Sequence, residues 1–244
     1  MSMDPLLARA QGLWEDLARV PVSFAPKGGV NVVVSPESGL CPVGWVGVVA
    51  LGGSAIVTVP TESASVIVRD ALWGMPVDSV VDAAAVREVL PVAGVLGPAM
   101  LSYVSPEGFR PTVAPPMVEQ LPGRHPAVCG LEEAAGHEDA AEAALAETTS
   151  PAFVVRKDGR VVAAAGYQVW LRRTAHLSVL TAPDARGRGL ARVTGSAAAA
   201  HALAEGLLPQ WRAVSVASQR VAAALGFEEM GAQLSIEVVQ ESHR

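Results

Sequence analysis

Cysteine, lysine, aromatic side chains and charge are all scarce in this sequence of 244 residues. The two cysteines, Cys41 and Cys129, are too few for a disulfide framework or a four-cysteine zinc site, and no metal site is predicted. Only 17% of the residues are charged and 50% are hydrophobic, which excludes an intrinsically disordered chain. The formal net charge of −6 argues against a dedicated nucleic-acid-binding protein.

The longest stretch without a charged residue, 38–61, has the length of a membrane span. Glycine and proline interrupt it repeatedly, however, and two valine-rich runs flank Gly52 and Gly53. This pattern predicts a hairpin of two strands, 45–51 and 54–60, in place of a span. The first residues also lack the basic region of a secretory signal. We therefore expect a cytoplasmic protein that binds neither membranes nor nucleic acids.

Prolines cluster between residues 109 and 126, where an extended, irregular connector is expected. The sequence thus predicts an N-terminal α/β domain at 1–110, a proline-rich connector at 111–124 and a second domain at 125–244. No cluster of residues in the first domain indicates chemistry. It is interpreted either as a degenerate half of the same fold as the second domain or as a separate lid.

Hydrophobic periodicity predicts alternating helices and strands, that is, an α/β (α+β) fold. The expected helices are 5–19 with Asp4 as its N-cap, 62–73, 79–90 with Asp78 as its N-cap, 130–148 with a break near Gly136, 189–205 and 218–225. The expected strands besides the hairpin are 31–34, 96–104, 152–156, 160–171, 175–181 and 233–239.

One segment has the features of an anion site. A strand ends at Thr181, and Arg186-Gly-Arg-Gly189 then leads directly into an alanine-rich helix. The first turn of a helix carries unpaired N–H groups and the positive end of the helix dipole. Glycines at 187 and 189 let a phosphate approach the backbone closely. The nearby arginines that add positive charge are Arg186, Arg188 and Arg192.

This segment lacks the pattern of a P-loop. Residues 186–191, Arg-Gly-Arg-Gly-Leu-Ala, instead resemble the pyrophosphate loop of the GNAT superfamily of acyl-CoA-dependent N-acyltransferases, whose signature is Gln/Arg-x-x-Gly-x-Gly/Ala. Downstream, residues 218–227 end in Leu-Gly-Phe and resemble the second landmark of that family. The resemblance covers roughly 120–244, and the first half carries neither landmark.

The resemblance implies a mixed, mostly antiparallel central sheet flanked by helices, with acetyl-CoA as cosubstrate. In the family, the strand before the loop splays from its neighbour, its backbone binds the pantetheine arm, and N–H groups of the loop hold the pyrophosphate. Carried over to this chain, cofactor binding falls on Val179, Leu180, Thr181, Arg186, Gly187, Arg188, Gly189, Leu190 and Ala191.

At the catalytic positions this chain departs from the pattern of the family. Many family members have a carboxylate on the splayed strand and a tyrosine before the Gly-Phe pair, whereas this chain offers only His176 and Ser178 on the strand and has Ala222 at the tyrosine position. His176 suits base catalysis near neutrality, or it simply packs at a strand end. Other candidates are Tyr103 and Tyr167 as acids and Glu132 and Glu133 near the acceptor.

Three functions remain open from the sequence. The first is an N-acetyltransferase that moves an acetyl group from acetyl-CoA to a primary amine of a small-molecule or amino-acid-like acceptor by direct attack. The second is a non-catalytic acyl-CoA-binding or sensor protein. The third is an interaction protein without CoA affinity, and a homodimer is compatible with the sequence.

Overall fold

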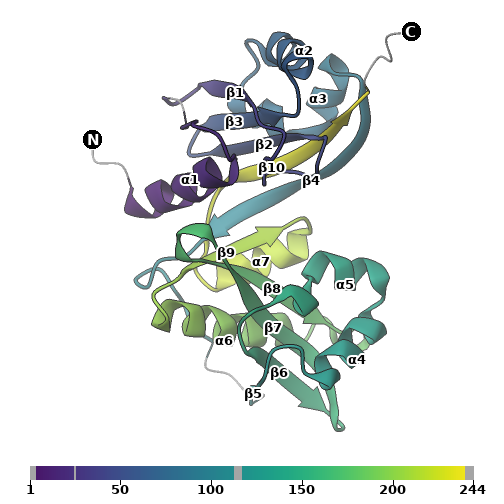
Figure 1. The fold of residues 1–244 in the computed structure, drawn as a ribbon. Coiled ribbons are helices and arrows are strands. Elements are labelled where there is room, and N and C mark those ends of the chain that lie inside the picture. The colour runs from purple at the N-terminus through teal and green to yellow at the C-terminus, as the bar shows by residue number, and fades with distance from the viewer. Residues whose placement is uncertain (1–3, 25, 113–116, 240–244) are drawn as a thin grey trace. The chain divides into compact units, whose positions relative to one another are not determined.

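The computed structural model describes residues 4–24, 26–112 and 117–239 (Figure 1). Contacts divide the chain into two compact units. The first contains the residues up to 101 together with those from 229 onward, and the second contains residues 102–228. This division differs from the expected boundaries because the last strand belongs to the first unit. The assignment of separate domains stays a prediction.

The first unit is a five-stranded sheet with helices, in the strand order β1-β3-β2-β10-β4. β1 runs parallel to β3, while β2 is antiparallel to both β3 and β10. Its elements are α1 (Pro5–Leu17), β1 (Val30–Val34), β2 (Val46–Leu51), β3 (Ser54–Val59), α2 (Glu62–Leu72), the 3₁₀ turn η1 (Val77–Val81), α3 (Ala83–Val89), β4 (Val92–Tyr103, up to residue 101) and β10 (Glu228–Val238, from residue 229).

The uncharged stretch 38–61 forms the predicted hairpin. β2 and β3 pair antiparallel up to Leu51 and Ser54, and both strands are buried throughout. Gly52 and Gly53 turn the chain with φ values of 62° and 82°, a region in which side chains are strained. Within the described ranges, no helix is both long and apolar enough to cross a membrane.

The helix cap predicted at Asp78 is wrong. Residues 77–81 form a separate 3₁₀ turn, and Asp78 lies inside it. The α-helix starts only after Asp82, whose carboxylate accepts hydrogen bonds from the N–H groups of Ala84 and Ala85 at 2.8 and 2.9 Å. Asp4 does cap α1, since its carboxylate accepts from the Leu6 N–H at 2.9 Å, as expected.

β10 explains why the end of the described chain belongs with the first unit. It lies between β2 and β4, and its pairing with β2 places Gly231 opposite Leu51 and Leu234 opposite Val48. Leu234 and Ile236 are fully buried there among valines of β2 and β3. The expected strand at 233–239 is therefore present, but its partner lies near residue 50.

The second unit is a mixed α/β structure, with the strand order β9-β8-β7-β6-β5. Neighbouring strands from β5 to β8 are antiparallel, and β8 and β9 are parallel, which confirms the predicted mostly antiparallel sheet flanked by helices. Its elements are β5 (Glu119–Leu121), α4 (Pro126–Ala135), α5 (His137–Ala143), η2 (Leu145–Glu147), β6 (Ala152–Lys157), β7 (Arg160–Trp170), η3 (Leu171–Arg173), β8 (Thr174–Thr181), η4 (Pro183–Ala185), α6 (Leu190–Ala204), β9 (Leu208–Ala213) and α7 (Val216–Ala224).

Helices cover both faces of this second sheet (Figure 1). The alanines of α6 pack with Phe153, Ala165 and Tyr167. On the other face, Val154, Ala164 and Leu180 belong to the cluster that contains the buried side chains of α4. The side chains of β8 therefore alternate between a face covered by α6 and a face covered by α4 and α5.

The helix expected at 130–148 has other bounds: it starts at Pro126 and ends at Ala143. The break expected near Gly136 is confirmed, because Gly136 adopts a φ of 91° and ends α4 before α5 begins. Strand β9 was not predicted at all: it contains Pro209, and its nearly continuous burial hides any alternation of polar and apolar residues.

Candidate active site

Two parallel strands, β8 and β9, diverge at one side of the second sheet. β8 pairs with β9 only from Thr174 opposite Leu208 to His176 opposite Gln210. β8 continues to Thr181 with β7 on its other side, and β9 continues to Ala213. Backbone groups of residues 177–181 on the β9 side therefore have no strand partner in the described chain. An extended ligand can pair with them as an added strand does.

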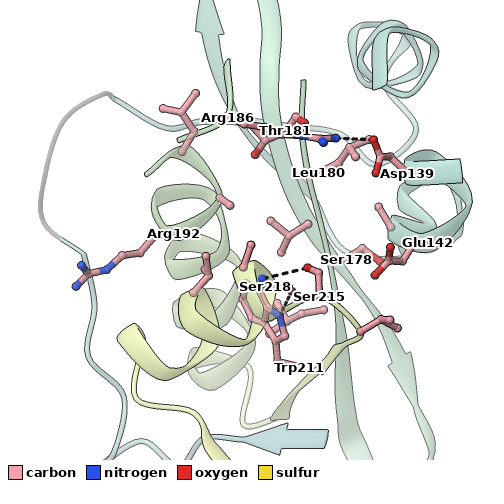
Figure 2. A pocket seen from close by; sticks show the side chains of 18 of the residues that line it. Asp139, Glu142, Ser178, Leu180, Thr181, Arg186, Arg192, Trp211, Ser215 and Ser218 are labelled. Atoms are coloured by element: carbon pink, nitrogen blue, oxygen red, sulfur yellow. Dashed lines mark hydrogen bonds and ion pairs between the residues drawn. The ribbon is translucent and has the colours of Figure 1, made fainter. Parts of the chain in front are cut away.

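A cavity of about 470 Å³ opens at this divergence (Figure 2). Its walls come from β8, the loop after β8, the start of α6, the end of β9, α7 and α5. Of the residues singled out from the sequence, those that line it are His176, Ser178, Val179, Leu180, Thr181, Arg186, Gly187, Gly189, Leu190, Ala191 and Arg192; Arg188 lies outside the lining.

The two glycines of the loop need to be glycines. Gly187 and Gly189 have φ values of 73° and 76°, and no atom lies within 4 Å of the position that a Cβ would occupy. Gly189 is the N-cap of α6 and provides no side-chain cap for the first N–H groups of the helix. Leu190 and Ala191, the first residues of the helix, line the cavity, and unpaired N–H groups at the start of a helix are groups that can bind phosphate.

The three arginines near the loop have different roles. Arg186 donates from Nη2 to the Asp139 carboxylate of α5 at 2.5 Å and from Nε to the Thr181 carbonyl at 3.3 Å. Arg188 donates to the Asp184 carbonyl at 3.2 Å. Arg192 also lines the cavity, although Figure 2 shows its guanidinium pointing away from β8 and α5. Of these three side chains, Arg186 alone bonds to groups on both β8 and α5.

His176 is held in a fixed orientation at the closed end of the divergence. Its ring stacks on Trp170 with centroids 4.1 Å apart, and Nδ1 lies 2.9 Å from Oε1 of Gln210. The Gln210 amide donates in turn to the Tyr103 hydroxyl at 2.7 Å. Because Oε1 of Gln210 can only accept, His176 carries its proton on Nδ1, and Nε2 is left as the acceptor.

This environment makes His176 a neutral side chain. Desolvation by the surrounding protein lowers its pKa to about 4, against an opposing effect of the Gln210 hydrogen bond, and the charge of Arg212 lowers it further. His176 is therefore uncharged at neutral pH and a weaker base than a free imidazole.

The lowered pKa predicts a pH-dependent stability. In the unfolded chain His176 takes up a proton below about pH 6.5, whereas the folded protein resists until about pH 4, so acidification favours unfolding. Between pH 6.5 and 5 we expect the free energy of unfolding to fall by about 2 kcal/mol through this residue. Urea titrations should show a flatter pH dependence for His176→Gln. His137→Gln, at the exposed start of α5, is the control, and equal slopes for all three proteins would contradict the prediction.

The other acid and base candidates from the sequence lie outside the cavity lining. The Glu132 carboxylate accepts from the Ala146 N–H at 3.1 Å, and Glu133 is exposed. The Tyr103 hydroxyl is bonded to Gln210, and the Tyr167 hydroxyl lies 2.9 Å from Nδ1 of His201. None of the four is placed to exchange a proton with a molecule in the cavity.

The cavity instead contains two carboxylates that the sequence did not single out. Asp139 and Glu142 lie one helical turn apart on α5 and extend toward β8, Asp139 toward Arg186 and Glu142 toward Ser178 (Figure 2). Their i, i+3 spacing within the acidic 137–143 segment is the signal that they share a helix face. It does not tell which face of the helix is covered.

Comparison with known proteins gives an assignment for this part of the chain. Residues 148–232 match the family model described as GNAT acetyltransferase. Residues 148–232 form a GNAT acetyltransferase domain. No curated protein matches the sequence.

Solved structures resemble the GNAT domain and its surroundings at low identity. A GNAT-family acetyltransferase from Colwellia psychrerythraea is 16% identical, with 98% of each chain covered and a TM-score of 0.49. A GCN5-related N-acetyltransferase from Kribbella flavida is 18% identical over 66% of this chain and 64% of its own, with a TM-score of 0.49. A GCN5-related N-acetyltransferase-like protein from Streptococcus suis is 19% identical over 75% and 71%, with a TM-score of 0.44. The family match alone therefore carries the assignment.

Proposed function

We propose that the protein is an N-acetyltransferase that moves an acetyl group from acetyl-CoA to a primary amine of a small-molecule acceptor by direct attack. The observation that carries the proposal is the divergence of β8 and β9, which leads to the N-terminal end of α6 at Gly187 and Gly189. It joins a strand edge that can pair with a pantetheine arm to a helix start that can hold a diphosphate.

The residues of this chain divide the binding task between them. The backbone of 177–181 on the β9 side would hydrogen-bond the amides of the arm. The N–H groups of 187–191 would hold the diphosphate, and Arg186 would add a cation at its edge. Acetyl-CoA, when bound, supplies an acyl group activated as a thioester.

The protein would then act mainly by positioning. Holding the acceptor amine against the thioester carbonyl replaces a bimolecular encounter. A backbone N–H of β8 near Ser178 would stabilise the negative charge that develops on the carbonyl oxygen. His176 and Ser178 stay candidates for proton handling, His176 through its free Nε2.

A thiol-release assay tests this function. The protein, acetyl-CoA and a panel of primary amines should release free CoA thiol, which a non-catalytic binder would not do.

Arg186→Gln should raise the Kd for acetyl-CoA about tenfold, because one charge-assisted hydrogen bond is lost. Isothermal calorimetry measures that change. The control is Arg160→Gln, an exposed residue whose ion pair with Asp184 spans 3.7 Å. Equal affinities for the two variants would contradict the placement of the diphosphate.

A further inference from the structure

The charged groups of the cavity fall into two sets. At the α6 end, the Asp139 carboxylate already pairs with Arg186, and the guanidinium of Arg192 points away from β8 and α5. At the other end, Glu142 of α5 and Arg212 of β9 both line the cavity. The nitrogens of Arg212 lie farther than 4.0 Å from the oxygens of Glu142, beyond the distance of an ion pair. The carboxylate and the guanidinium therefore line the same cavity without pairing with each other.

These two groups border the same face of the diverging strands. His176 and Gln210 are the last paired residues, and the hydrogen bond between their side chains places both on one face of the sheet. Two residues further on, Ser178 and Arg212 point to that same face, because side chains alternate along a strand. Glu142 extends toward Ser178 from α5 (Figure 2).

Arg212 also interacts electrostatically with Glu142 and with His176. Arg212 is exposed, but the protein around its guanidinium lowers its pKa by desolvation, and the Glu142 carboxylate raises it. The charge of Arg212 also reaches His176. Glu142, His176 and Arg212 therefore border the same part of the cavity, at the end opposite the N-terminus of α6.

The geometry points to a free α-amino acid as the acceptor, with its ammonium group at Glu142 and its carboxylate at Arg212. This inference rests on the proposed function and names the substrate class of the same site. A zwitterion carries a positive and a negative group a few bonds apart, which is what a separated carboxylate and guanidinium complement. A simple amine would leave the guanidinium unpaired, and a neutral acceptor would leave both groups unpaired.

Glu142 has a second task in this arrangement. The acceptor ammonium must lose a proton before its nitrogen can attack, and the Glu142 carboxylate takes it. The nitrogen then bonds to the thioester carbonyl carbon, the carbon–sulfur bond breaks, and the second ammonium proton leaves with the thiolate as CoA thiol. Glu142 returns its proton to solvent, so one proton is released for each acetyl group transferred.

Matched acceptors test the carboxylate contact. Panels of L-α-amino acids would be assayed beside their amides and decarboxylated amines, for example L-leucine, L-leucinamide and 3-methylbutylamine. For an accepted amino acid, kcat/KM should exceed that of its amide about 100-fold. Arg212→Gln should reduce this ratio to within about threefold by raising KM for the acid. Arg220→Gln, an exposed residue of α7 outside the cavity, should keep the wild-type ratio.

Glu142→Gln tests the ammonium contact. It should lower kcat/KM about 100-fold at pH 7, and the loss should shrink as the pH approaches the pKa of the acceptor ammonium, because free amine is then supplied by solution. Glu138→Gln on the exposed side of the same helix is the control. A loss that does not change with pH would assign Glu142 a structural role and overturn its part of the inference.

The outcomes separate this inference from the proposed function. Thiol release with amines, amides and acids alike, unchanged by Arg212→Gln, would overturn the amino-acid acceptor and leave the acetyltransferase standing. If no compound releases thiol, calorimetry with L-leucine and the rest of the panel on CoA-saturated protein decides. Binding that is lost in Arg212→Gln but kept in Arg220→Gln would support the zwitterion site without turnover, and no binding would overturn it.

Discussion

Gly189→Glu should weaken acetyl-CoA binding at least about 100-fold. The substitution places a side chain where the structure has open space, forces a φ of 76° on a residue with a Cβ, and brings a carboxylate to the N–H groups that would hold the diphosphate. Losing two charge-assisted hydrogen bonds alone accounts for that magnitude. Isothermal calorimetry with acetyl-CoA measures it, and circular dichroism checks the fold.

Gly159→Glu is the matched control for this variant. Gly159 has a φ of 78° in the hairpin between β6 and β7, also with no atom within 4 Å of a Cβ, but it does not line the cavity. It should show the same conformational strain and keep normal affinity. If Gly189→Glu binds acetyl-CoA as well as Gly159→Glu does, the N-terminal end of α6 is not the diphosphate site.

Gly226→Ala should strongly destabilise the protein, with a loss of about 3 kcal/mol or more in the free energy of unfolding. Gly226 has a φ of 86°, and an added Cβ would stand 2.1 Å from the Gly108 carbonyl oxygen. The neighbouring backbone cannot yield easily, because the Arg110 N–H donates to the Leu225 carbonyl at 2.9 Å. Thermal unfolding should show a Tm about 10 °C lower.

Gly136→Ala separates the two causes of this loss. Gly136 has a φ of 91° between α4 and α5, with nothing within 4 Å of a Cβ, so it carries the strain of a positive φ without the clash. We expect about 1–2 kcal/mol for it. Equal losses at the two glycines would show that the contact with Gly108 does not matter and that the positive φ alone accounts for the loss at Gly226.

The sequence predicted those parts of the structure that depend on local patterns. The loop glycines, the hairpin at Gly52 and the helix after Gly189 all follow from residue types that few conformations accept. His176 and Ser178 were placed on one strand by spacing alone, and both line the cavity.

The rest depends on contacts between distant segments. Nothing in the sequence near Glu142 indicates that Arg212, 70 positions later, borders the same cavity. The lowered pKa of His176 likewise comes from burial and from Arg212, which no local pattern encodes. β9 was missed because its residues are buried on both faces, so the alternation that marks a strand is absent.

The position of β10 has a consequence for the order in which the protein can fold. Residues 102–228 leave the ribosome as one continuous stretch and have all the strands of their sheet when residue 213 has been made. The other sheet lacks the strand between β2 and β4 until residue 238 is synthesised, although its first strand begins at residue 30. Residues 102–228 therefore have all their strands before the last strand of the other unit is made, whereas β2 and β4 keep the edges that β10 pairs with open until the end of β10 is synthesised.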